Sequence, residues 1–201
     1  NRWCLWLQNA SPGDIRALPE VSSRVAKVKK YREESTRAAT QKLALYPSLF
    51  GEIRQPKKDF ILVPRHSSET RSYIPMGYFS PDFIVHDSCC CIPSASLFEF
   101  AVLESTMHMA WVKVVCGRIK SDYRYSNKLV YNNYPWPEAV SGVQKAAAEK
   151  AAQNVLDARL LFPGSTLADL YDPTTMPPAL VKAHAELNRA VDRCFARSVS
   201  N

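Results

Sequence analysis

The chain has 201 residues, which is enough to bury a core as one large domain or as one domain with a small appendage. Its residues are 46% hydrophobic and 22% charged, a balance typical of a globular protein and not of a disordered one. The net charge of +7 favours an anionic partner, nucleic acid first and a membrane surface second. The sequence has no run of about 18 apolar residues that could span a membrane.

The N-terminal part is predicted to begin with a short strand and to continue as helix. Residues 3–7 alternate as a strand and lack the cleavage site of a signal peptide. The sequence begins abruptly inside this predicted strand, so we expect a fragment of a longer protein. A short helical piece near residues 15–18 precedes a long basic helix from about Ser22, its N-cap, to residue 46, before Pro47. Such a helix could lie along a phosphate backbone or be an ordinary solvated surface.

Apolar runs at residues 60–63, 73–79 and 89–92 predict strands, with a polar loop at residues 64–71 between the first two. Donors suited to phosphate oxygens in this loop are Arg65, Ser67, Ser68 and Arg71. The third run contains three of the six cysteines, which are adjacent and therefore form neither a disulfide framework nor a zinc motif. We predict buried thiols in a reducing cytosol and no metal site.

Residues 96–115 predict one helix that is apolar over most of its surface and therefore central to the core. A lone histidine on such a helix, His108, is predicted to be a hydrogen-bonded core residue and not a catalyst. The helix leads directly into a basic, aromatic segment that breaks at Gly117 and stops at Pro135-Trp136-Pro137. We expect the helix to mount this segment rigidly.

An extended conformation of that segment would place Lys120, Asp122 and Arg124 on one side. The other side would then hold Ile119, Ser121, Tyr123 and Tyr125. Lys or Arg can donate to the two major-groove acceptors of guanine, and Asp can accept from the exocyclic amine of cytosine. One Lys-x-Asp pair could therefore check both halves of a G·C pair.

Three other interpretations of this segment and of the basic surface stay open from spacing alone. The strand could be ordinary solvated surface whose Lys and Asp neutralise each other. The basic surface could meet an acidic protein as an interaction or scaffold domain. The chain could also bind single-stranded RNA, with Tyr123, Tyr125 and Tyr131 as stacking platforms.

The composition changes after residue 137. An alanine-rich helix is predicted over residues 144–161, a short helix follows the capping box at Thr166, and a last helix starts at Pro177-Pro178. We therefore expect an α+β fold, with a mixed or antiparallel sheet around a central apolar helix over residues 1–137. A small all-helical C-terminal domain is expected over residues 138–201.

Motifs of self-contained catalysis are missing from the sequence. It contains no Gly-rich phosphate loop, HExxH, GxSxG or dinucleotide fingerprint. The amino-methyltransferase tetrapeptide of Asn/Asp-Pro-Pro-Tyr/Phe type is also missing, since its nearest echo, Asn133-Tyr134-Pro135-Trp136, lacks the double proline. No catalytic residue is predicted in this chain.

Nearly the whole chain resembles, in order, the C-terminal third of the MmeI-like family of bacterial adenine-specific DNA methyltransferases. Many members are fused to a nuclease as single-chain type II restriction–modification enzymes. The resemblance to the recognition region is carried by residues 3–7, 49–56, 63–69, 73–77, 105–111, 116–126 and 130–137. Residues 167–173 and 176–180 resemble the terminal helical region, while Cys89-Cys90-Cys91 and His66 depart from the usual residues.

The resemblance implies a cytoplasmic target recognition domain and helical cap that act on double-stranded DNA. No cofactor is expected in this chain, since S-adenosylmethionine would bind in the preceding methyltransferase domain of the same parent chain. In the family, the pair that matches Lys120 and Asp122 varies with the recognised base pair, and Arg118 and Arg124 would read or brace nearby. Phosphates would be held by Arg65, Ser67, Ser68, Arg71 and Arg37.

Overall fold

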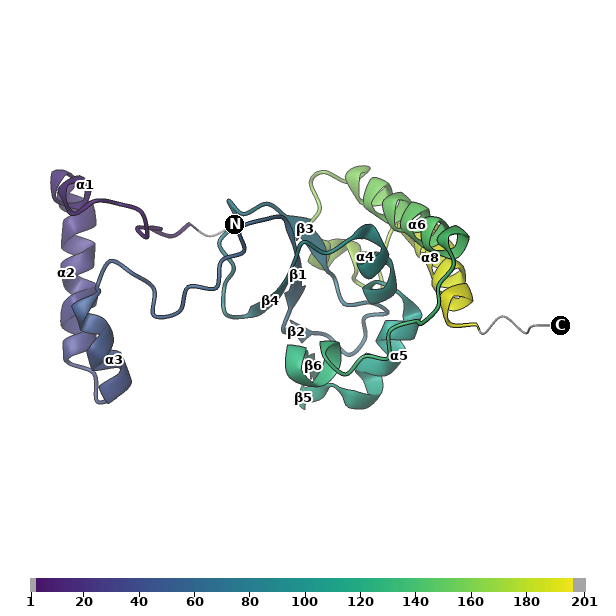
Figure 1. Ribbon diagram of the computed structural model, residues 1–201, viewed down its shortest axis with the longest axis horizontal. Helices are drawn as coiled ribbons and strands as arrows, with labels where there is room; N and C mark the ends of the chain where they lie inside the picture. Colours follow the sequence, from purple (N-terminus) through teal and green to yellow (C-terminus); the bar gives the residue numbers. More distant parts are fainter. Residues whose placement is uncertain (1–2, 197–201) are drawn as a thin grey trace. The chain divides into compact units, whose positions relative to one another are not determined.

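The computed structural model describes residues 3–196 and divides the chain into two compact units, residues 1–54 and residues 55–201 (Figure 1). The first unit contains α1 (Pro12–Ala17), α2 (Pro19–Glu33), α3 (Ala38–Lys42) and the 3-10 turn η1 (Leu43–Leu45). The strands of the second unit are β1 (Phe60–Pro64), β2 (His66–Ser67), β3 (Gly77–Phe79), β4 (Cys89–Pro93), β5 (Gly117–Ile119) and β6 (Asp122–Arg124). Its helices are α4 (Leu97–Leu103), α5 (Thr106–Val115), the π-helical turn η2 (Asn127–Tyr131), α6 (Gly142–Leu160), α7 (Leu167–Leu170) and α8 (Pro178–Phe195).

Two predictions for the first unit are wrong. Residues 3–7 form no strand, and the long helix predicted from Ser22 to residue 46 is broken after α2. Helix α2 starts at Pro19, because proline fits the first helical position, so Ser22 lies inside the helix and is not its cap. The break follows from Arg32, whose guanidinium donates to carbonyl oxygens of the following segment and folds that segment back. These acceptors are Leu43, Tyr46 and Leu49, at 3.0, 2.9 and 2.8 Å.

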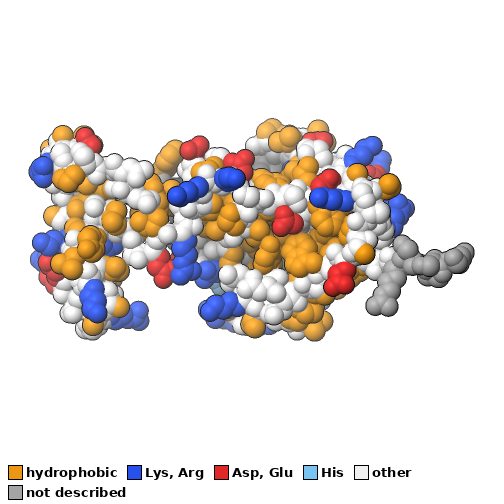
Figure 2. Space-filling model, in the orientation of Figure 1, with side chains coloured by type: hydrophobic (Ala, Val, Ile, Leu, Met, Phe, Trp, Pro, Cys, Tyr) orange, Lys and Arg blue, Asp and Glu red, His pale blue; other side chains and the backbone are white. Residues whose placement is uncertain are grey.

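The first unit has very little core. Among residues 3–54, Ala44 alone is buried, and Tyr31 and Leu45 are 76% and 77% exposed. Figure 2 shows apolar side chains and Lys and Arg side chains exposed together on these helices. We infer that the hydrogen bonds of Arg32 contribute more to the shape of this unit than apolar burial does.

Two small antiparallel sheets form the β part of the second unit. One has the strand order β3-β1-β4, and the other has the order β2-β6-β5. The predicted strands at residues 60–63 and 89–92 are confirmed, while only the last three residues of the predicted strand 73–79 form β3. Pro75 is buried just before β3, which is an edge strand, the position that proline tolerates. The predicted α+β class is confirmed.

The single helix predicted over residues 96–115 is two helices, α4 and α5, separated by Glu104 and Ser105. Ser105 accepts a hydrogen bond from the backbone N–H of His108 and so caps α5. Glu104 is fully buried, and its carboxylate accepts from the N–H of Met76 at 2.8 Å and from Arg159 at 3.0 Å. The break lets this carboxylate reach partners far away in the sequence.

The C-terminal helices agree with the predictions. Capping boxes start α6 at Ser141 and α7 at Thr166, and α8 follows Pro177. Helices α6 and α8 pack against each other and against α4 (Figure 1). One apolar core therefore runs from β1 and α4 into α6 and α8, across the boundary expected near residue 137.

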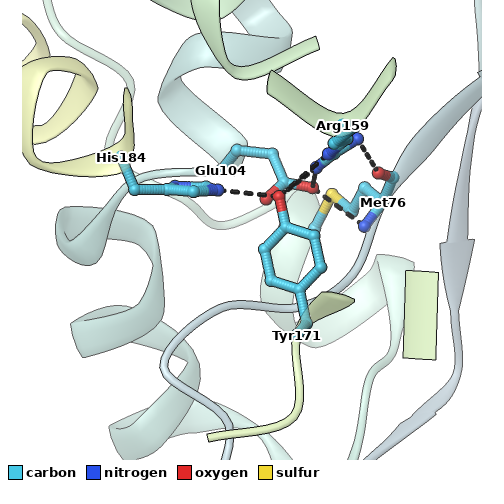
Figure 3. Close-up of polar contacts among 5 residues, drawn as sticks. All are labelled: Met76, Glu104, Arg159, Tyr171 and His184. Carbon is cyan, nitrogen blue, oxygen red and sulfur yellow. Dashed lines mark hydrogen bonds and ion pairs between the residues drawn. The ribbon is translucent and has the colours of Figure 1, made fainter. Parts of the chain in front are cut away.

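A buried polar network crosses the same boundary (Figure 3). Arg159 of α6 donates to the carboxylate of Glu104, to the carbonyl oxygen of Met76 at 2.7 Å and to the hydroxyl of Tyr171 at 3.0 Å. The Tyr171 hydroxyl also pairs with Nε2 of His184 at 2.7 Å. The four side chains are between 0% and 8% exposed, so each charge depends on these partners.

The six cysteines differ in how deeply they are buried. Cys116 and Cys194 are buried as predicted, Cys89-Cys90-Cys91 are half-buried on β4, and Cys4 is exposed because its segment joins no sheet. Within residues 3–196, no group of three Cys, His, Asp or Glu side chains could hold a metal ion. Over the same residues, no helix has both the length and the apolar character needed to cross a bilayer.

Candidate nucleic-acid interface

The predicted reading segment folds as a hairpin of β5 and β6, with β2 paired on the other side of β6. Ile119 lies opposite Asp122, so Lys120 and Ser121 form a two-residue loop. On the β2 side, His66 lies opposite Arg124 and Ser67 opposite Tyr123. Residues directly opposite each other in antiparallel strands share a face, so this register defines two faces of the small sheet.

The inner face is the one that carries Tyr123 and Ser67, which are 2% and 4% exposed. The outer face carries Asp122, Arg124 and, beside Arg124, His66, all of which are exposed. The prediction that Asp122 and Arg124 lie on one side of the strand is therefore confirmed. We call His66, Asp122, Arg124 and the loop residue Lys120 the outer surface of the hairpin sheet.

The predicted position of Lys120 is wrong. Lys120 lies in the loop, with a φ of 56°, because the chain reverses there and does not continue as one extended strand. For the same reason Ile119 and Ser121 are exposed and do not share the buried face of Tyr123. The loop places Lys120 at the tip of the hairpin.

Two of the three tyrosines proposed as stacking platforms are not available for stacking, while the third, Tyr131, is half-buried. Tyr123 and Tyr125 are each 2% exposed, since both rings belong to the core. The hydroxyl of Tyr125 pairs with Nε2 of His108 at 3.1 Å. Single-strand binding through these two rings is therefore excluded in this conformation.

Helix α5 mounts the hairpin, as predicted. Its C-cap is the buried Cys116, and β5 follows at the next residue. His108 on α5 is a fully buried core residue that bonds Tyr125 just after β6, as predicted for it. Burial lowers the pKa of His108 to about 4, so its ring is neutral at pH 7. Trp111 also donates from Nε1 to the carbonyl oxygen of Val130 at 3.0 Å.

Arg118 is engaged within the protein. Its Nη1 donates to the carbonyl oxygen of Ser121 at 2.7 Å and lies 3.8 Å from the Glu69 carboxylate. Its guanidinium carbon lies 4.1 Å from the centre of the Tyr123 ring. In addition, the backbone N–H of Glu69 donates to Oδ1 of Asp122 at 3.3 Å. Of the two roles predicted for Arg118, the contacts favour bracing over base reading.

Lys120, Arg124 and Arg65 carry uncompensated positive charge. All three are exposed, and among residues 3–196 no carboxylate lies within ion-pair distance of them. The backbone of Arg65 is fixed, since its N–H donates to Ser88 at 2.9 Å and its carbonyl accepts from Tyr125 at 2.7 Å. This arrangement suits a polyanion.

The remaining predicted phosphate contacts of the second unit, Ser67, Ser68 and Arg71, do not form one exposed cluster. Ser67 is buried, so its hydroxyl does not belong to the surface. Arg71 is half-buried and donates to the carbonyl oxygen of Ala168 in α7 at 3.3 Å. Ser68 is half-buried and bonds Thr70 at 3.0 Å. Arg37 belongs to the first unit, where it precedes α3.

Sequence reasoning missed two residues of this site, His66 and Glu69. The pairing of β2 with β6 creates both positions, and β2 is only two residues long within a loop that shows no strand pattern. The sequence offers one clue, because Glu69 is an acid in an otherwise basic loop. Its partner Arg118, however, lies about fifty residues further along the chain.

Comparisons with known proteins agree with this architecture. Residues 1–138 match the family model described as the MmeI target recognition domain, and residues 140–201 match that of the MmeI C-terminal domain. DNA methyltransferase A of Bacillus subtilis (strain 168) is 43% identical over 194 residues, which cover 96% of this chain and 22% of that protein.

A solved structure of the type IIL restriction-modification enzyme MmeI in complex with DNA is similar over 98% of this chain, with 43% identity and a TM-score of 0.92. The match covers 27% of that chain, so our chain spans roughly a quarter of the length of each relative. The resemblance drawn from the sequence motifs is confirmed. The chain belongs to the MmeI family, of which it contains the target recognition domain and the C-terminal domain.

Proposed function

We propose that the chain is the sequence-specific, double-stranded DNA recognition module of an adenine-specific (N6) DNA methyltransferase. The observation that carries the proposal is the outer surface of the hairpin sheet, with a loop lysine at its tip and an aspartate and an arginine behind it. A two-stranded ribbon fits the major groove of B-DNA, where each base pair presents a distinct donor and acceptor pattern.

The proposed roles follow the chemistry of the side chains. Lys120 and Arg124 would donate to guanine, and Asp122 would accept from the amine of cytosine through its free carboxylate oxygen. Arg65, Ser68 and Arg37 would hold phosphates and add sequence-independent affinity. Ser67 and Arg71 are left out of the proposal because of their burial and internal contacts. Residues 1–137 would supply recognition, and residues 138–201 would support it as a helical domain.

Methyl transfer belongs, in this proposal, to the part of the parent protein that precedes this chain. An adenine must leave the base stack before its amine can be methylated, and this requires a pocket of its own. S-adenosylmethionine, the methyl donor, would bind in that methyltransferase domain and not among the residues described here. That domain would be the second partner of this chain, besides DNA.

Replacing Lys120 or Asp122 with alanine is expected to relax the preference at one position of the recognised sequence. Each loss should cost about 1–3 kcal/mol of discrimination between the right and the wrong base pair. Competition binding with a set of duplexes that differ at single positions measures this effect. Equal discrimination in the variants and the wild type would contradict the roles given to both residues and favour a protein-interaction or scaffold domain.

Replacing Arg65 with glutamine is expected to weaken binding to all duplexes alike. A side chain that contacts only a phosphate carries no base information, but its loss removes about one unit from the slope of log affinity against log salt. Titrations at several salt concentrations measure the slope. Loss of preference at a single base position would instead make Arg65 a base reader.

A further inference from the structure

Lys120 has an unfavourable backbone conformation. Its φ of 56° lies in the left-handed region that glycine adopts freely and that costs a residue with a Cβ about 1 kcal/mol or more. Two-residue hairpin loops favour glycine or asparagine at positions with positive φ, and here a lysine stands at the first loop position. Such a conformation persists only where neighbouring contacts hold it.

Those contacts come from Arg118 and Glu69. Arg118 lies on β5, directly before the loop, and donates to the carbonyl oxygen of Ser121, the other loop residue. The Tyr123 ring on β6 and the Glu69 carboxylate in the loop after β2 both lie close to its guanidinium, which is thus held from two segments of the chain. A planar guanidinium can make these contacts at once, whereas an ammonium cannot.

Glu69 also holds the first residue after the loop, because its backbone N–H donates to Asp122. One residue of the β2 loop therefore contacts both ends of the hairpin loop, Arg118 through its side chain and Asp122 through its backbone. The two proposed readers, Lys120 and Asp122, are set in position by the same pair of residues.

We propose that Arg118 and Glu69 are positioning residues for base discrimination. They fix the loop so that Lys120 and Asp122 meet one base pair together, and they do so without contacting DNA. This inference rests on the proposed function. It assigns Arg118 a role different from that of Lys120 and Arg124, although all three are exposed cations of one hairpin.

The first test measures the loop in the free protein. Backbone 15N order parameters at Lys120, Ser121 and Asp122 are compared in the wild type, Arg118→Gln and Glu69→Gln. Arg54→Gln is the matched control, since it removes the same charge from a surface Arg–Glu pair at 2.7 Å in the other unit. We expect order parameters of about 0.85 at these three residues in the wild type to fall below about 0.6 in Arg118→Gln, and to stay unchanged in the control. Unchanged order parameters in Arg118→Gln would overturn the proposal.

The second test measures discrimination by the full chain. Arg118→Gln is expected to lower the preference by about tenfold at the same base position as Lys120→Ala, with an unchanged salt slope. Glu69→Gln should act in the same direction and less strongly, since it keeps the backbone donor to Asp122. A salt slope lower by about one, with intact preference, would make Arg118 a phosphate contact and overturn the proposal.

A third variant separates the backbone strain at Lys120 from base reading by its side chain. Lys120→Gly relieves the left-handed conformation, so we expect an unchanged or higher midpoint of unfolding together with the full loss of preference at that position. If the wild type itself prefers no sequence, Lys120→Ala cannot change the base preference either. That result overturns the proposed function. If the positioning role alone is wrong, Lys120→Ala still lowers the base preference, whereas Arg118→Gln leaves it unchanged.

Discussion

Replacing Arg159 with methionine is expected to lower the free energy of unfolding of the second unit by about 3–5 kcal/mol. The change leaves the carboxylate of Glu104 fully buried with a single N–H donor from Met76, and it removes a donor from the carbonyl oxygen of Met76 (Figure 3). Burial raises the pKa of Glu104 while Arg159 lowers it. Without the arginine, the carboxyl group would either be protonated or remain as a buried charge without a cationic partner. Urea unfolding followed by circular dichroism measures the loss.

A double variant tests whether the two charges act as a pair. Glu104→Leu combined with Arg159→Met removes both buried charges, so its loss of stability should be smaller than the sum of the two single losses. Lys150→Met, an exposed cation on the same helix, is the matched control and should change stability by less than about 0.5 kcal/mol. Losses that simply add would show that Glu104 and Arg159 are not coupled.

Acid is expected to destabilise the chain well above the range in which carboxylates titrate. Burial lowers the pKa of His108 to about 4 and that of His184 to about 3, where the charge of Arg159 adds to the effect. An unfolded histidine titrates near 6.5, so between pH 6.5 and 4 the unfolded state binds protons that the folded state does not. Stability should therefore fall as pH falls, by about 3 kcal/mol in total for His108.

The slope of stability against pH between 6 and 4 measures this effect. His108→Gln keeps a hydrogen-bonding group for Tyr125 without a titrating ring, so its slope should be shallower by about 1.4 kcal/mol per pH unit. His86→Gln, at an exposed histidine, is the matched control for the substitution itself. Glu104 acts in the opposite direction, since its raised pKa favours the folded state in acid, but it is common to both variants. An unchanged slope in His108→Gln would refute the account.

The C-terminal helices were predictable because their signals are local. Capping boxes such as Thr166 with Asp169 lie within one turn, and the apolar stripe of α8 repeats at helical spacing. The buried strand β1 was predictable for a similar reason, as a short apolar run. In these elements each residue's partner is close to it in the sequence or is simply the apolar core.

The predictions failed where one side chain has distant partners. The break between α4 and α5 serves Glu104, whose partners Met76 and Arg159 are 28 and 55 residues away. The helix predicted through residue 46 ends early because Arg32 binds carbonyls up to 17 residues ahead. The position of Lys120 depends on a loop that Arg118 and Glu69 hold, and no local pattern shows this.

The most direct test of the recognition function is selection of the chain against a pool of random duplex DNA at two salt concentrations, followed by sequencing. We expect enrichment of one short motif at both concentrations, with a single position relaxed in Lys120→Ala and in Asp122→Ala. Binding that depends on salt but enriches no motif, or no binding even at low salt, would contradict base reading by the outer surface of the hairpin sheet.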